Sequence, residues 1–254
     1  MSIPVVLDSD AETDDAIAIL LAARHPGLDL LGVSTASAEE AARLREMTAV
    51  VGDVGVHVGV DWLRETLTAA AEPVTLVTTG PLTHVAAALA ADRSLARAVR
   101  RLVVLGGAHR EPGVTAHAER NIWSDPDAAA AVLTAPFRDV LLVTADATAS
   151  VALDDADLAR LRALGTPVAR AAADLAATRL DRGARVHDPL AVAALLDPGL
   201  LTTLRAAVRV ERSDPETYGA TRFAAELDEK QGRATVAVRA DKRRYVDLLR
   251  AAFS

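Results

Sequence analysis

Cysteine is absent from the 254-residue sequence, which excludes disulfide bonds and thiolate metal sites. Aromatic residues make up only 3% of the chain, so a core must be built from aliphatic side chains. Lys and Arg are fewer than Asp and Glu, 28 against 35, and the net charge of −7 gives no electrostatic footprint for nucleic acid. No signal peptide is visible, and charged residues interrupt every apolar segment before it reaches membrane-spanning length. We therefore expect a cytoplasmic protein whose partner is a small molecule rather than nucleic acid or a membrane.

Hydrophobic residues nevertheless make up 51% of the chain, enough for one large domain with a sizeable core. In the first 150 residues, short apolar runs typical of buried strands alternate with helical segments. The predicted strands are residues 5–7, 28–35, 56–60, 74–79, 102–105 and 140–144, and the predicted helices are 16–23, 38–51, 61–71, 82–91 and one that opens at 124–127. This alternation predicts an α/β fold with an open, mostly parallel, doubly wound sheet and helices on both faces.

The second half of the chain has a different pattern. Helices are predicted at residues 154–164 and 167–180, from residue 190 and at 241–253, with a polar stretch at 181–188 and strands at 206–212 and 234–239. No linker, low-complexity segment or short internal repeat separates the two halves. We therefore expect a single domain over residues 1–254.

The densest group of chemically active residues follows the first predicted strand. Four aspartates and one glutamate fall within eight positions, namely Asp8, Asp10, Glu12, Asp14 and Asp15. They lie on a strand-to-helix turn, and open parallel sheets bind ligands at that edge. Repulsion among so many carboxylates must be offset by protons or a cation. A hard cation that takes oxygen ligands, such as Ca²⁺ or Mg²⁺, is the simplest answer.

A structural explanation accounts for part of this cluster. Acidic residues suit the N-terminal end of a helix dipole, which explains Asp14 and Asp15. It does not explain Asp8 and Asp10, which alternate at the end of an apolar strand. An EF-hand is excluded, because the sixth position counted from Asp8 is Thr13 rather than Gly.

Polar residues also gather at the ends of the other predicted strands, at 78–80, 106–107 and 144–146. Because the carboxyl ends of parallel strands share one edge of a sheet, these residues are expected to line one pocket. His187 and Asp188 are a further candidate pair at the start of a later helix. By itself, Asp188 before Pro189 is equally typical of an ordinary helix cap.

Taken together, these motifs resemble the nucleoside hydrolase family, the inosine-uridine-preferring hydrolases. Residues 8–16 resemble the family's opening Asp-x-Asp-Pro-Gly-x-Asp-Asp-Ala, and residues 79–83 its Thr-Gly-Pro-Leu-Thr. The further matches are 105–108 to Met-Gly-Gly, 118–122 to Glu-Phe-Asn, 125–129 to Asp-Pro-Glu-Ala-Ala and 186–189 to the late His-Asp motif. The motifs follow the family's order and span nearly the whole chain.

The resemblance implies a calcium site. Its ligands would be the carboxylates of Asp10, Asp15 and Asp188 and the backbone carbonyl of Thr79. Asp8 would lie behind these ligands and orient them. In the family, a calcium-bound water attacks C1′ of a ribosyl group, so the resemblance implies an N-ribohydrolase acting on nucleosides or related ribosyl compounds.

The resemblance also implies roles for the surrounding side chains. Asp10 would be the general base, while Asp14, Glu119 and Asn121 would hold the ribose hydroxyls. His187 would protonate the leaving base, a step suited to an imidazole near neutral pH. Glycosidic cleavage passes through a transition state like an oxocarbenium ion, whose positive charge a carboxylate-rich pocket stabilises.

This sequence departs from the family pattern at several positions. Ala11 and Glu12 replace Pro-Gly, His84 replaces an Asn, and residues 36–38 and 112–115 lack the Asn residues expected there. A long segment that the family carries is missing between residues 35 and 75. Trp123 could stack on a base, although an aromatic residue beside a helix start is more often part of the core. The expected metal ligands are therefore retained, while the expected substrate contacts are fewer.

Two other functions compete with hydrolysis. A ligand-binding protein could keep the affinity for calcium and ribose without turnover, and the thinned substrate contacts favour it. A phosphatase of the haloacid dehalogenase type also opens with a strand that ends in Asp-x-Asp. The paired Asp14 and Asp15, and the lack of an evident Lys before the late acid, speak against the phosphatase. A homo-oligomer is compatible with the sequence.

Overall fold

The apolar run at the start of the chain forms β1 (Ile3–Asp8), which pairs in parallel with β2 (Leu28–Thr35) and β4 (Val74–Thr78). Val5 and Leu7 pack into one hydrophobic cluster, whereas Val6 packs into a second cluster on the opposite face. A strand buried on both faces requires helices on both sides of its sheet. The computed structural model describes residues 2–181, 185–224 and 233–254, so part of the predicted polar stretch 181–188 lies outside the described residues.

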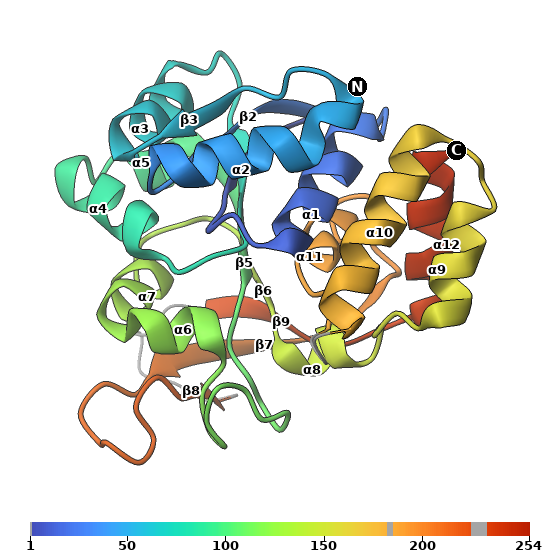
Figure 1. Cartoon of the computed structure of the whole chain (residues 1–254). Coiled ribbons are helices and arrows are strands. Elements are labelled where there is room, and N and C mark those ends of the chain that lie inside the picture. Colours follow the sequence, from blue (N-terminus) through green and yellow to red (C-terminus); the bar gives the residue numbers. More distant parts are fainter. Residues whose placement is uncertain (1, 182–184, 225–232) are drawn as a thin grey trace.

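The nine strands of the described residues form one sheet in the order β3-β2-β1-β4-β5-β6-β9-β7-β8 (Figure 1). The remaining strands are β3 (Val56–Val58), β5 (Val99–Leu105), β6 (Val140–Val143), β7 (Leu201–Val210), β8 (Thr221–Ala224) and β9 (Arg233–Ala240). The seven neighbouring strands β3, β2, β1, β4, β5, β6 and β9 all pair in parallel. β7 runs antiparallel to its two neighbours, β9 and β8. The predicted open, mostly parallel sheet is therefore confirmed.

Helices cover both faces of the sheet (Figure 1). One face carries α1 (Thr13–Arg24), α2 (Ala38–Thr48), α9 (Asp155–Arg162), α10 (Pro167–Asp181), α11 (Pro189–Ala193) and α12 (Lys242–Phe253). The other face carries α3 (Val60–Ala69), α4 (Thr83–Ala91), α5 (Leu95–Ala98) and α7 (Pro126–Leu133). Three short helices, η1 (Ala49–Val51), α6 (Arg120–Ser124) and α8 (Ala145–Ala149), complete the described secondary structure. None of the described helices is both long and apolar enough to cross a membrane.

Several element boundaries differ from the predicted ones. Gly59 takes a φ of 91°, which ends β3 and lets α3 begin at Val60 instead of leaving that residue in the strand. β7 begins at Leu201, five positions before the predicted start. The prediction missed this part of the strand because it is largely exposed and lacks an apolar run. The short elements α5, α6, α8 and β8 were not predicted, since a few residues carry no readable hydrophobic period.

Candidate active site

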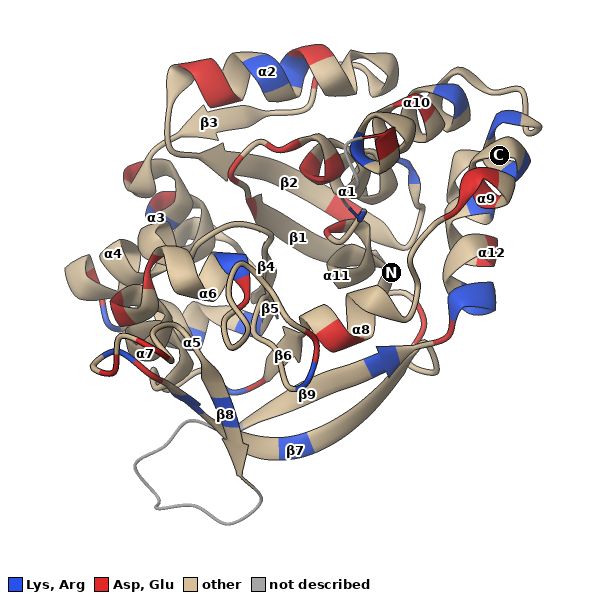
Figure 2. Ribbon diagram, turned by 60° about the horizontal axis from the view of Figure 1, so that its bottom comes forward, with Lys and Arg blue, Asp and Glu red and all other residues tan. Residues whose placement is uncertain are grey.

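The turn between β1 and α1 holds the acidic cluster at the carboxyl edge of the sheet (Figure 2). Glu12 caps α1 through a reciprocal capping box, in which its own N–H donates to Asp15 Oδ2 at 2.8 Å. Ala11 has a φ of 58°, a left-handed conformation that costs a non-glycine residue about 1–2 kcal/mol. Its N–H donates to Ser9 Oγ at 3.0 Å, which helps to hold this conformation. Two local hydrogen bonds therefore fix the backbone of the turn from which the acidic side chains project.

The residues predicted to form the site meet around one cavity of about 460 Å³. The lining includes Asp10, Asp14, Thr79, Glu119, Asn121, His187 and Asp188. Asp15, the remaining predicted ligand, is fully buried beside it and accepts a hydrogen bond from the Thr79 hydroxyl. Segments far apart in the sequence, from residue 10 to residue 188, thus converge at the carboxyl ends of β1, β4 and β5.

Burial makes the charged form of several of these acids unfavourable. It raises the pKa of Asp10, and it raises the pKa values of Asp15 and Asp188 well above their usual range. Negative charge on Asp10 adds to the effect at Asp15, and negative charge on Asp14 adds to it at Asp188. The group therefore needs protons or an added cation to offset its charge.

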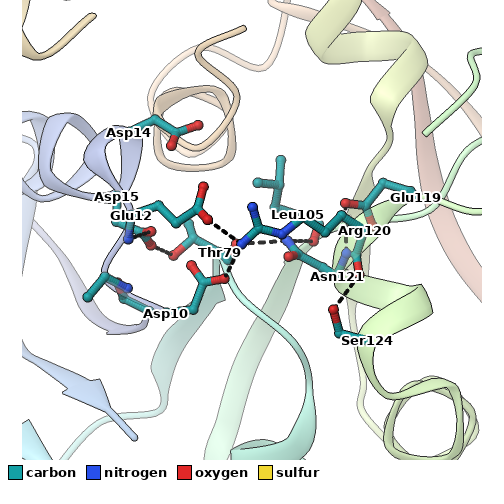
Figure 3. A network of polar contacts seen from close by, with 12 residues as sticks. Asp10, Glu12, Asp14, Asp15, Thr79, Leu105, Glu119, Arg120, Asn121 and Ser124 are labelled. Atoms are coloured by element: carbon teal, nitrogen blue, oxygen red, sulfur yellow. Dashed lines mark hydrogen bonds and ion pairs between the residues drawn. The ribbon is translucent and has the colours of Figure 1, made fainter. Parts of the chain in front are cut away.

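Two arginines supply part of that positive charge. Arg120 pairs with Glu12 and lies 3.3 Å from Asp10 Oδ2, measured from Nη2 (Figure 3). Arg179 contacts Glu12 Oε2 at 2.6 Å and Asp14 Oδ2 at 3.3 Å. Although Glu12 is partly buried, hydrogen bonds from the two guanidinium groups lower its pKa. The result is an alternating chain of charges across the cavity, which the sequence analysis did not foresee.

Asp14 is held on one side only. Its Oδ2 atom accepts the backbone N–H of His187 at 3.1 Å as well as the contact from Arg179. Its Oδ1 atom is buried and has no hydrogen-bond partner among the described residues. A buried carboxylate oxygen without a partner marks a place where a ligand, a metal or a water is required.

Glu119 and Asn121 lie across the cavity from the acidic turn (Figure 3). The Asn121 side-chain amide donates to the backbone carbonyls of Thr79 and Leu105, at 2.8 and 3.1 Å. The Glu119 carboxylate caps α6 and accepts three backbone N–H groups, from Gly107, Asn121 and Ile122. Both side chains thus hold the backbone that surrounds the cavity. A carbonyl oxygen has two lone pairs, so the Thr79 carbonyl can accept a second partner besides Asn121.

His187 lines the cavity just before α11. Its Nδ1 atom is 2.7 Å from Thr148 Oγ1, and among the described residues Nε2 makes no hydrogen bond. Burial lowers the pKa of His187, so the neutral imidazole is favoured near neutral pH.

Asp8 lies behind the cavity lining and makes different contacts. Its carboxylate accepts the Ser34 hydroxyl and contacts His84 Nδ1 at 3.0 Å. The hydrogen bond to Asp8 raises the pKa of His84. His84, which replaces an Asn of the family pattern, thus forms an ion pair with Asp8 at the end of β1.

The donor set fits a hard cation in its chemistry, because carboxylate and carbonyl oxygens are the ligands of such ions. No three His, Asp or Glu side chains of the described residues are arranged as a ready metal site. The reason is that their oxygens point to protein donors: those of Asp15 to Thr79 and the turn backbone, and that of Asp10 to Arg120. Calcium ligation would require these carboxylates to turn from those donors.

No Phe, Tyr or Trp side chain of the described residues lines the cavity. All seven aromatic residues of the sequence fall within the described part of the chain. Trp123 is 43% exposed, packs beside Gly219 and is not part of the cavity lining.

Comparison with known proteins identifies the class. The family model for inosine-uridine preferring nucleoside hydrolases matches residues 39–247, and the chain belongs to this family. It is therefore an N-ribohydrolase, an enzyme that cleaves N-glycosidic bonds.

Individual relatives extend the match to the acidic turn. The pyrimidine-specific ribonucleoside hydrolase RihA of Shigella boydii serotype 4 is 31% identical over 304 aligned positions, covering 98% of this chain and 97% of that protein. The RihA protein of Escherichia coli O139:H28 matches with the same identity and coverage. The aligned length exceeds the 254 residues of this chain, so the relatives carry segments that it lacks.

Solved structures show the same fold. A plant nucleoside hydrolase, PpNRh1, superposes with a TM-score of 0.86 at 25% identity, covering 100% of this chain and 99% of that one. An inosine-guanosine nucleoside hydrolase superposes with a TM-score of 0.87 at 20% identity, with the same coverage. At 20% identity the likeness concerns the fold alone.

Proposed function

We propose that this chain hydrolyses the N-glycosidic bond of ribonucleosides at the cavity between the acidic turn and His187, with calcium as its metal. The observation that supports the proposal most directly is the meeting of Asp10, Asp14 and Asp15 with the late Asp188 around one cavity. A cytoplasmic location and a role in purine and pyrimidine salvage belong to the same proposal.

The metal ligands in this proposal are the carboxylates of Asp10, Asp15 and Asp188 and the backbone carbonyl of Thr79. The raised pKa values of the buried acids support it, because a dication would offset the charge that burial makes unfavourable. Calcium bound there would supply Lewis acidity, which lowers the pKa of water and fixes its direction of attack.

Asp10 is the general base in this proposal. It faces the cavity together with Asp14, so a water held between these acids and the sugar could give its proton to Asp10. The other acids stabilise the positive charge that develops on the ribosyl ring more than they stabilise the neutral ground state.

The ribose and the leaving base divide the rest of the cavity. Asp14 faces the ribose hydroxyls from one side, and Glu119 and Asn121 face them from the other. The protonated form of His187 donates a proton to the departing base through Nε2, since Nδ1 is held by Thr148. The lowered pKa makes this imidazolium a stronger acid.

The test is a panel of purine and pyrimidine ribonucleosides incubated with the purified protein, with free ribose measured as product. We expect ribose release that a chelator abolishes and that added Ca²⁺ restores. Asp10→Asn should lower kcat by about 10²–10⁴-fold, the usual contribution of a general base. Asp53→Asn is the matched control, because Asp53 is exposed and lies outside the cavity.

The competing functions give different results in the same panel. If nucleosides stabilise the protein against heat but no ribose is released, the protein is a ligand-binding protein and not a hydrolase. Ribose release that neither the chelator nor Asp10→Asn reduces would overturn the assigned metal site and base.

A further inference from the structure

Two buried side-chain atoms have no hydrogen-bond partner among the described residues: Asp14 Oδ1 and the hydroxyl oxygen of Tyr245. Buried polar atoms are nearly always paired, so each exception requires a physical reason. One of these atoms accepts hydrogen bonds only, and the other can donate one. The two exceptions are therefore chemically complementary.

The two atoms also belong to helices that pack together. Tyr245 is fully buried in α12, and α12 packs against α1 and α11. Asp14 lies in the first turn of α1, and Asp188 directly precedes α11. Negative charge on both acids acts on the buried phenol, and Tyr245 is not part of the cavity lining, so the phenol lies near the acidic group on its protein side.

The charges at this point favour donation from the phenol. Burial raises the pKa of Tyr245 far above its usual value, and the negative charges of Asp188 and Asp14 raise it further. The hydroxyl therefore keeps its proton and lies in the field of two carboxylates. A single buried water between a donor and an acceptor of this kind would satisfy both.

We infer that Tyr245 is a positioning residue of the active site, whose hydroxyl holds the Asp14 carboxylate in place through one buried water. This inference rests on the proposed function, in which Asp14 faces the ribose. With Oδ1 fixed from behind, Oδ2 stays on the His187 N–H and on Arg179. Tyr245 thus sets the direction of a carboxylate that contacts substrate, without contacting substrate itself.

Tyr245→Phe tests the inference, because it removes one oxygen and keeps the ring. We expect kcat for ribose release to fall about tenfold, the lower range for loss of a partner that orients a site residue. KM should change less than kcat, since ribose contacts strengthen in the transition state. The pair Tyr245→Phe and Asp14→Asn should be non-additive in kcat.

Thr48→Val is the matched control. It also removes a buried hydroxyl, one that donates to Leu44 within α2, away from the cavity. We expect it to lower the melting temperature and leave kcat unchanged. If the Tyr245 hydroxyl is merely unpaired, Tyr245→Phe will raise the melting temperature at unchanged kcat, and the inference is overturned.

A second measurement does not depend on turnover. The chain has two tyrosines, Tyr218 and Tyr245, so incorporated 3-fluorotyrosine gives two ¹⁹F NMR signals, which Tyr218→Phe assigns. Tyr218 is 38% exposed and serves as the internal control. We expect saturating Ca²⁺ to shift the Tyr245 signal and not that of Tyr218.

The two measurements separate this inference from the proposed function. A Tyr245 signal that does not move while calorimetry shows bound Ca²⁺ would overturn the inference. A shifted Tyr245 signal in a protein that releases no ribose from any nucleoside would support the link to the acids and overturn the proposed function.

Discussion

The guanidinium of Arg120 lies against the carboxylate of Asp10, with 3.3 Å between Nη2 and Oδ2 (Figure 3). Arg120 also pairs with Glu12, and neither of these two residues matches the family's pattern at its position. A cation beside Asp10 competes with a divalent metal for the same oxygen. Part of the positive charge that the acidic cluster needs is therefore supplied by the protein.

Removing this cation should strengthen calcium binding. We expect Arg120→Gln to lower the Kd for Ca²⁺ by about three- to tenfold, because a close charge near the surface is worth about 1–4 kcal/mol before screening. Isothermal titration calorimetry at fixed ionic strength measures the effect. Arg185→Gln is the matched control: Arg185 lines the same cavity with similar exposure but pairs with Glu111. An equal gain in both variants would assign the effect to net charge instead of to the contact with Asp10.

The sequence predicted some parts of the fold and of the site and missed others. The parallel sheet followed from its apolar runs, and the acids of the first turn followed from their spacing and from where open sheets bind ligands. The role of Arg120 did not, because its partner Asp10 lies 110 positions away and nothing in the motif that contains Arg120 points to that contact. Arg179, 165 positions from Asp14, is a similar case.

The first half of β7 shows the same limit for the fold. Residues 202–205 are exposed, so they carry no alternation that a sequence can reveal, and they form a strand because β9 supplies hydrogen bonds. Asn121 is the converse: its type and motif were recognised, while its two carbonyl partners appear only once β4 and β5 lie side by side. Local patterns thus predict elements and residue types, and tertiary contacts decide the partners.

The ion pair of Asp8 with His84 should make stability depend on pH. Since the hydrogen bond to Asp8 raises the folded-state pKa of His84 above its ordinary 6.5, the contribution is complete below that value and is lost as pH rises through the folded pKa. We expect His84→Asn to lower the melting temperature more at about pH 6 than at about pH 8.5. His25→Asn is the contrast, because burial lowers the pKa of His25 and reverses the sign. A melting-temperature difference for His84→Asn that does not vary with pH would contradict the pair.

Glu119 should contribute to both stability and catalysis. Its carboxylate accepts three backbone N–H groups, and Glu119→Gln replaces one acceptor oxygen by a donor that faces them. We expect a loss of about 1–3 kcal/mol in the free energy of unfolding, the cost of unsatisfied buried donors, together with a higher KM for nucleosides. Asp125→Asn is the control, since Asp125 caps α7 outside the cavity and should lower stability without changing KM. Unchanged KM in Glu119→Gln would limit Glu119 to a structural role.

Gly80 gives the sharpest test of how closely Asp10 must be placed. A Cβ atom at Gly80 would lie 2.9 Å from Asp10 Cβ and 3.0 Å from Asp10 N, so Gly80→Ala must displace the turn that carries the base. We expect kcat to fall about 10- to 100-fold, because a displacement of about 1 Å in a reacting group costs on the order of 10²-fold. Gly55→Ala is the matched control: the nearest atom to its Cβ is the movable end of the His57 side chain, at 3.1 Å. A Gly80→Ala enzyme that keeps both the melting temperature and the kcat of the wild type would show that Asp10 tolerates displacement and is not the base.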